Sequence, residues 1–170
     1  MALIKTVRNY TPQFGKNCFL ADNSTIVGDV VVGDHCSFWF NSVIRGDVNS
    51  IRIGNKVNIQ DGTVLHCLYE KSTINIGNKV SIGHNVIIHG ATIRDNVLIG
   101  MGAIIMDDAV IEKNSIIAAG AIVLNGTKVE AGSIYGGVPA KRIKSINQEQ
   151  TKEMIEKIAQ NYLMYASWYE

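Results

Sequence analysis

The chain has 170 residues, and its 16 basic and 15 acidic side chains leave a formal net charge of +1. This near balance gives no electrostatic reason to expect nucleic acid or an anionic membrane surface as a partner. No apolar run approaches the roughly 18 residues of a membrane span, and the first residues lack an apolar stretch of signal-peptide length. Three scattered cysteines, Cys18, Cys36 and Cys67, favour reduced thiols in a cytoplasmic protein over a disulfide framework.

Sixteen glycines, two prolines and abundant Ile and Val predict many short strands joined by tight corners. From Ser24 onward, a mostly apolar residue recurs every six positions, and a second column of inward residues, mostly small in the last run, stands two positions before it. The repeated positions are Ile26, Val32, Phe38, Ile44, Ile53, Ile59, Leu65, Ile76, Ile82, Ile88, Ile93, Ile99, Ile105, Ile111, Ile117, Val123, Val129 and Tyr135. Both columns face inward because strand side chains alternate.

A six-residue unit of this kind is one flat side and one corner, and three units close a triangular coil. The 18 repeated positions therefore predict six coils, stacked at the strand spacing of about 4.8 Å. The expected fold is all-β, a parallel β-helix of hexapeptide repeats. An ordinary β-sandwich is disfavoured because sandwiches have no fixed period of six.

The period is interrupted three times, between residues 44 and 93. The step is nine residues from Ile44 to Ile53, eleven from Leu65 to Ile76 and five from Ile88 to Ile93. We expect extra residues to leave the coil as loops, and such loops commonly carry function. Every histidine except His35 lies in this window.

Counting through these breaks places three outward residues on the same side of consecutive coils. Arg45, His66 and His89 each follow an inward aliphatic residue of that side, so they form a column with a step of about 4.8 Å. Asp61 and His84 project from a different edge. A trimer of triangular coils could therefore complete a metal site with two histidines from one chain and one from the next.

Three histidines with an open fourth position suit a zinc site. The alternative is that these are inert histidines on the surface of a β-helix.

The last stretch changes period. From about Gln148 to Trp168, apolar residues fall at helical spacing with no Gly or Pro between them, which predicts a helix laid along the coils and capped by Ser145 or Asn147. We expect a β-helix domain over residues 1–145 and a helical segment over residues 146–170.

Several motifs carry a family resemblance. They are Arg45-Gly46-Asp47, Asn58-Ile59-Gln60-Asp61-Gly62, His66, His84 and Val86-Ile87-Ile88-His89-Gly90. With these motifs the chain, over residues 10 to 145, closely resembles the γ-class carbonic anhydrase-like family of hexapeptide-repeat proteins. The ending Gly136-Gly137-Val138-Pro139-Ala140-Lys141 is shared by many hexapeptide acyltransferases and is less specific.

The resemblance implies a left-handed coil and a homotrimer with three metal sites between subunits. His66 and His89 would come from one chain and His84 from its neighbour, holding Zn²⁺, with Fe²⁺ or Co²⁺ as alternatives. The implied reaction is the reversible hydration of CO2 by metal-bound hydroxide.

The resemblance also implies roles for four further residues. Arg45 and Asp47 would form an inter-subunit ion pair, Gln60 would orient the metal-bound water, and Asp61 would pair with an arginine across the interface. Alternatively, Arg45 and Asp61 only hold the trimer together.

The sequence departs from the family prototype at the proton shuttle. Val48 and Tyr69 stand where the prototype has glutamates, and Glu70 is the only acid in the short loop from Cys67 to Thr73. Glu70 or Tyr69 is thus the candidate shuttle, while Tyr162 and Tyr165 of the terminal helix either reach the site or pack against the coils.

Two other functions stay open for a fold of this kind. One is a hexapeptide acyltransferase that uses coenzyme A and a histidine as general base. The other is a catalytically weak, metal-binding trimer that acts as a scaffold.

Overall fold

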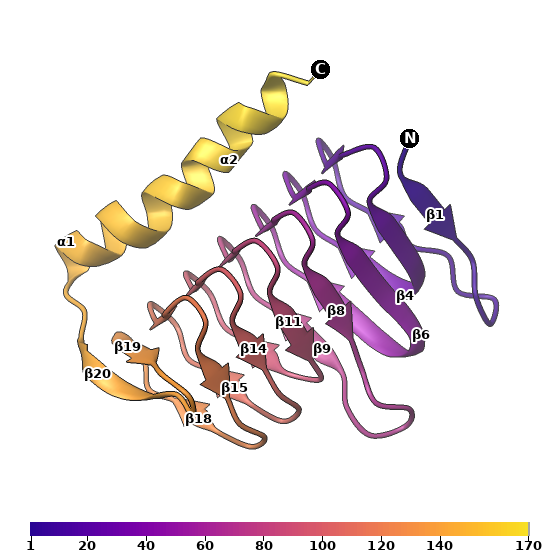
Figure 1. Ribbon diagram of the computed structural model, residues 1–170. Helices are drawn as coiled ribbons and strands as arrows, with labels where there is room; N and C mark the ends of the chain where they lie inside the picture. Colours follow the sequence, from indigo (N-terminus) through magenta and orange to yellow (C-terminus); the bar gives the residue numbers. More distant parts are fainter. Residues whose placement is uncertain (170) are drawn as a thin grey trace.

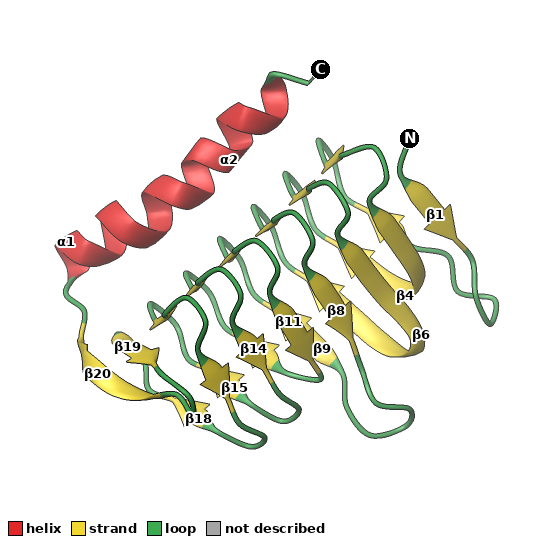
Figure 2. Cartoon of the chain, in the orientation of Figure 1, coloured by secondary structure: helices red, strands yellow, loops and turns green. Residues whose placement is uncertain are grey.

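The computed structural model describes residues 1–169, which form a parallel β-helix of about seven turns followed by one C-terminal helix (Figures 1 and 2). Each coil contributes short strands to three flat faces, which we call faces A, B and C. The strands of face A are β1 (Leu3–Lys5), the first halves of β4 (Thr25–Val32) and β6 (Val43–Ile53), β8 (Val64–His66), β11 (Ile87–His89), β14 (Ile104–Ile105) and β17 (Ile122–Val123).

The second halves of β4 and β6 bend onto face B. With them on face B lie β2 (Gln13–Phe14), β9 (Ile74–Ile76), β12 (Thr92–Ile93), β15 (Val110–Ile111) and β18 (Lys128–Val129). Face C consists of β3 (Phe19–Leu20), β5 (Ser37–Phe38), β7 (Asn58–Ile59), β10 (Ser81–Ile82), β13 (Leu98–Ile99), β16 (Ile116–Ile117) and β19 (Ser133–Gly136). The strand β20 (Lys141–Ser145) pairs antiparallel with β19 and leads to the helix.

The register of the parallel strands confirms the hexapeptide period. Ile44 pairs with Leu65 and Leu65 with Ile88 on face A, and Ile53 pairs with Ile76 on face B. These inward residues are almost fully buried and form one continuous core along the axis of the solenoid. No single coil can bury its own apolar face, so the stacked coils together are the core.

The expectation of six coils was wrong by one, because a further coil precedes Ser24. Ile4, Phe14 and Leu20 pair with inward residues of the next coil. Ile4 is exposed, and Phe14 and Leu20 are only partly buried, because no coil stacks on their other side. The step from Ile4 to Phe14 is ten residues, and the six-residue period begins only at the aromatic Phe14. The first coil therefore gives a weak repeat signal.

Only one of the two insertions leaves the coil as a loop. The eleven-residue step forms the loop Cys67–Thr73 between β8 and β9, which is visible in Figure 1. The nine-residue step does not form a loop, contrary to expectation, because Asp47–Ser50 stay in the continuous strand β6. They bulge opposite the single residue Asp29 of β4, where the register shifts.

The C-terminal helix consists of α1 (Gln148–Thr151), a π-helical segment (Lys152–Glu156) and α2 (Lys157–Ser167). Asn147 rather than Ser145 caps it, since the Asn147 side chain accepts from the Gln150 amide and the Gln150 side chain accepts from the Asn147 amide. The helix runs back along the solenoid toward the N-terminal coils (Figure 1).

The helix covers face C. Ile155 is fully buried and packs with Ile116, and the ring of Tyr162 lies 5.3 Å from that of Trp39. Met154, one of the apolar residues at helical spacing, instead faces solvent. Among residues 1–169, no helix is long and apolar enough to cross a membrane.

The neighbours Ile111 and Val110 offer a direct test of the inward column. Ile111 is fully buried, whereas Val110 points outward on face B. We expect Ile111→Ala to lower the free energy of unfolding by about 2–5 kcal/mol through the cavity it leaves. Val110→Ala should cost about 1 kcal/mol or less. Thermal and denaturant unfolding check this, and equal losses in the two variants would contradict the register.

Candidate functional site

The outward column on face A is built by the same register that forms the core. Arg45 pairs with His66, and His66 pairs with His89, in β6, β8 and β11. The two imidazole rings are 5.4 Å apart, centre to centre. The stacking of these three side chains, predicted from the period alone, is therefore present.

Asp47 links the first two members of this column. Its Oδ2 accepts from Arg45 Nη1 at 2.6 Å, and its Oδ1 lies 3.2 Å from His66 Nε2. Burial by itself would raise the pKa of Asp47, but the hydrogen bond and the charge of Arg45 outweigh it and hold the pKa below its ordinary value. Within this chain, Arg45 and Asp47 thus form an intramolecular ion pair.

The environment of His66 favours its neutral form. Burial lowers the pKa of His66, and the Arg45 guanidinium lowers it further, against the opposing effect of the Asp47 carboxylate. A neutral imidazole has a lone pair to offer a metal ion.

His89 has its own carboxylate partner. Its Nδ1 lies 2.8 Å from Asp107 Oδ2, and Asp107 Oδ1 accepts from the Ser72 hydroxyl at 2.6 Å. Burial opposes ionisation of Asp107, yet the hydrogen bonds from Ser72 and His89 hold its pKa below the ordinary value. Asp107 is therefore a carboxylate that bonds the His89 ring.

His84 and Asp61 lie together at the other edge, as the count of the period predicted. His84 Nδ1 is 2.9 Å from Asp61 Oδ2, and both side chains are about two-fifths exposed. Gln60, beside them, is buried and donates through Nε2 to Asn58 Oδ1 at 3.0 Å. Asn58 in turn donates to Ser81 at 2.7 Å, so the orientation of the Gln60 amide is fixed.

Within one chain these residues do not form a complete metal site. Among residues 1–169, no group of three or more His, Cys, Asp and Glu side chains is placed to hold a metal ion. Cys67, although it follows His66, is buried, and burial together with nearby carboxylates raises the pKa of its thiol to about 11. It remains a thiol near neutral pH and is a poor ligand.

Of the two candidate shuttle residues, Glu70 lies at a small polar cavity beside the column. Glu70 and Asp47 both line this cavity of about 200 Å³, together with Asp29 and Arg8. Tyr69 is exposed, and the Arg8 guanidinium lies 5.6 Å from the centre of its ring. The N-terminal segment therefore folds over the loop that carries Glu70.

The tyrosines of the terminal helix both pack against the coils and reach His84. Tyr162 and Tyr165 line a cavity of about 370 Å³ with His84 and Gln60. Burial, with the nearby Asp61 carboxylate, raises the pKa of Tyr162 to about 12. Tyr162 is thus a neutral phenol, able to donate a hydrogen bond but not to act as a base near neutral pH.

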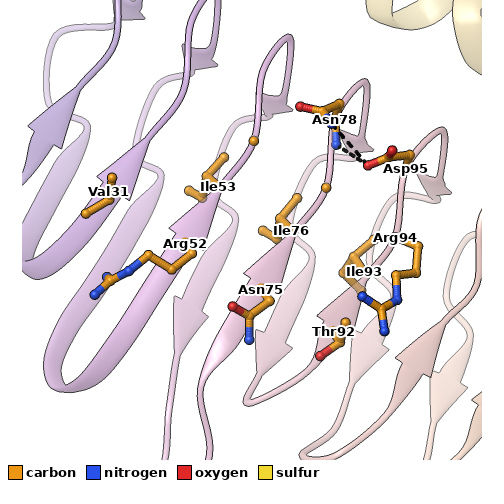
Figure 3. Close-up of a pocket in the computed structure, with 12 residues that line it drawn as sticks. Val31, Arg52, Ile53, Asn75, Ile76, Asn78, Thr92, Ile93, Arg94 and Asp95 are labelled. Carbon is orange, nitrogen blue, oxygen red and sulfur yellow. Dashed lines mark hydrogen bonds between the residues drawn. The ribbon is translucent and has the colours of Figure 1, made fainter.

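A larger groove of about 400 Å³ lies on face B, and no histidine lines it (Figure 3). Arg52 and Arg94 flank it, but Figure 3 shows their side chains pointing in different directions. Arg52 forms an ion pair with Asp29, in which Nη1 and Oδ1 are 2.8 Å apart. None of the predicted site residues lines this groove, so it is not the candidate site.

Reasoning from the sequence missed two residues of the site, Asp107 and Ser72, and it gave Asn58, which stands in a quoted motif, no role of its own. The register would have revealed Asp107, since Ile88 pairs with Ile105 in the next coil and Asp107 follows two residues later. The register does not reveal Ser72, because Ser72 meets Asp107 only through the way its loop folds back over the coil that carries Asp107.

Comparisons with known proteins agree with this fold. The family described as bacterial transferase hexapeptide (six repeats) matches residues 11–46 and 90–125, and the hexapeptide repeat of succinyl-transferase matches residues 73–106. A protein of Geobacillus kaustophilus named carbonic anhydrase is 42% identical over 168 residues, covering 99% of this chain and 91% of that protein.

Two further relatives extend the comparison. The Arabidopsis thaliana protein named gamma carbonic anhydrase 2, mitochondrial, is 36% identical over 96% of this chain and 60% of its own length. The crystal structure of a hexapeptide transferase family protein from Anaplasma phagocytophilum superposes with a TM-score of 0.93 at 36% identity, covering 99% of this chain and 98% of that one. The chain therefore belongs to the hexapeptide-repeat family, among the relatives of γ-class carbonic anhydrases.

Proposed function

We propose that this protein is a γ-type carbonic anhydrase that hydrates CO2 reversibly at metal centres shared between the subunits of a homotrimer. The observation that carries the proposal is the register of His66 and His89, with a carboxylate bound to one ring nitrogen of each. His84 of a neighbouring subunit would complete the ligand set, and Zn²⁺, Fe²⁺ or Co²⁺ would suit it.

The donor set fits such a metal. Imidazoles that bind a metal usually bond a carboxylate or carbonyl through their other ring nitrogen, which fixes the ring and raises its basicity. All three histidines have such a partner, in Asp47, Asp61 and Asp107. Histidines scattered on a surface by chance would have no reason to be paired in this way.

The surface around the histidine column supports the shared site. The residues directly before the inward column of face A form an outward apolar column of Val43, Val64, Ile87, Ile104 and Ile122, aligned by strand pairing. Ile87 is 42% exposed in the single chain. Leu124, two residues after Ile122, is 48% exposed. A continuous apolar surface of this kind is typical of a subunit interface.

The chain's own residues would then have separate roles in the reaction. Asp47 and Asp107 hold the His66 and His89 rings, and a bound metal supplies the Lewis acidity that makes water nucleophilic near neutral pH. Gln60, with its NH2 group bonded to Asn58, keeps its carbonyl oxygen free to accept a hydrogen bond in the His84 cavity. The released proton would pass by way of the polar cavity to Glu70 and solvent.

Removal of the ligands tests the metal centre. We expect the purified protein to contain close to one metal ion per chain, and His89→Ala and His84→Ala each to lose most of it, as measured by elemental analysis. The matched control is His35→Asn, because His35 is exposed with a φ of 57°, which Asn tolerates. A full complement of metal in His89→Ala would refute the ligand assignment.

Mixed trimers test whether the site is shared. Co-refolding His84→Ala subunits with His66→Ala/His89→Ala subunits would bring intact ligands together across some interfaces. We expect the mixture to regain metal that neither variant binds alone. Metal content that stays at the level of the separate variants would show that each site belongs to one chain.

Metal retention is also expected to depend on pH in a defined direction. The pKa of His66 lies below its ordinary value, so protons compete with the metal at His66 only in the range below about 6.5, the usual histidine pKa. Retention against a chelator should be constant near neutrality and fall as the pH drops through that range. A loss that already begins above neutral pH would contradict the neutral state of His66.

Stopped-flow hydration of CO2 tests the activity and the shuttle together. In weak buffer, Glu70→Gln should lower kcat by at least about tenfold while leaving kcat/KM nearly unchanged, and concentrated imidazole buffer should restore kcat. Glu112→Gln, an exchange of the same kind elsewhere on the solenoid, is the control. A rate no higher than that of free metal ions, combined with saturable binding of coenzyme A, would favour the acyltransferase instead.

A further inference from the structure

The hydrogen bond between His89 and Asp107 joins two successive coils. His89 ends β11, and Asp107 follows β14 in the next coil along the solenoid. Nδ1 and Oδ2 are 2.8 Å apart, and the side chains are 30% and 17% exposed. A partly buried, charge-assisted hydrogen bond of this length restrains rotation of the imidazole ring.

Gly90 makes the space that this arrangement needs. Its φ of +60° is a conformation that favours glycine. A Cβ at this position would collide with both Asp107 Oδ1 and Ser72 Oγ. The absence of a side chain at Gly90, directly after His89, therefore leaves the room that Asp107 and Ser72 occupy.

Ser72 extends the contact to the loop Cys67–Thr73. The Ser72 hydroxyl donates to Asp107 Oδ1 at 2.6 Å and accepts from the Leu68 amide at 3.0 Å. Ser72 is 4% exposed, so both bonds are shielded from water. The hydroxyl thus closes the loop on itself and anchors it to the carboxylate that holds His89.

From this geometry we infer that Asp107 is a positioning residue for His89, and that Ser72 couples the order of the loop Cys67–Thr73 to the orientation of that ring. The inference rests on the proposed metal centre, in which the Nε2 atom of His89 is the ligand atom. The same loop carries Tyr69 and Glu70. Asp107 therefore holds both the loop of the proposed shuttle and the metal ligand His89.

Four variants separate positioning from general stability. Asp107→Ala removes the acceptor of His89, Asp107→Asn keeps an amide oxygen that can accept from Nδ1, and Ser72→Ala releases the loop. Asp108→Asn is the matched control because Asp108 is exposed, carries the same charge, and bonds Asn125 rather than His89. Its φ of 60° suits Asn.

Four measurements on the chain of 170 residues are needed. Chelator competition gives the affinity for Zn²⁺, and the visible spectrum of the Co²⁺-loaded protein reports the ligand geometry. Long-range proton–nitrogen NMR of the metal-free protein in alkaline buffer shows which nitrogen of His89 carries the proton. Hydrogen exchange of the metal-free protein follows the Leu68 amide.

We expect Asp107→Ala to weaken Zn²⁺ binding by about 10- to 100-fold, to alter the Co²⁺ spectrum, and to shift the His89 proton away from Nδ1. Asp107→Asn should recover much of the affinity. Ser72→Ala should accelerate exchange at Leu68 and weaken Zn²⁺ binding less, and Asp108→Asn should match the wild type.

Wild-type Zn²⁺ affinity and an unchanged His89 tautomer in Asp107→Ala would overturn the positioning role. Unchanged Leu68 exchange in Ser72→Ala would overturn the coupling. A wild-type protein that binds neither Zn²⁺ nor Co²⁺ would instead overturn the proposed metal centre. The NMR and exchange results on the metal-free protein would still decide whether Asp107 holds His89 and Ser72 holds the loop.

Discussion

The structure depends on the in-register stacking of inward aliphatic side chains between successive coils. Most strands have only two or three residues and little stability alone, and all but those at the two ends of the solenoid have a parallel neighbour on either side. The buried Ile, Val and Leu residues fix which strand positions lie opposite one another, because a slip of one residue would turn the apolar side chains outward. The core therefore sets the register of the strands along the solenoid.

The same register places the outward residues. Because Leu65 pairs with Ile88, the residues that follow them, His66 and His89, must also be neighbours. The fold thus forms a column of chemically useful side chains without disturbing the core, since outward positions are not part of it. Departures from the period then bring in the partners of the column, with Asp47 in the bulge of β6 and Ser72 in the loop after β8.

Sequence reasoning was most successful where a residue's position follows from counting. The faces, the pairing of the histidines, and the separation of His84 from them all follow from a period of six. It was less successful at the N-terminal end of the solenoid, where the inward side chains of the first coil are incompletely buried and the repeat is weak. It also failed to distinguish an insertion that bulges within a strand, at Asp47–Ser50, from one that leaves as a loop, at Cys67–Thr73. The number of inserted residues does not specify whether backbone pairing continues.

The sequence by itself determined the solenoid, its register and the column of Arg45, His66 and His89, because each depends on short-range periodicity that recurs along the chain. Only the tertiary structure decided which carboxylate each histidine bonds. It also decided that Gln60 is held by Asn58, and that the terminal helix brings Tyr162 to the His84 cavity. Except for the bond between Gln60 and Asn58, these contacts join residues from different coils or from the helix and a coil. Their formation depends on how side chains and loops fill the space left by the backbone, which a repeating pattern does not encode.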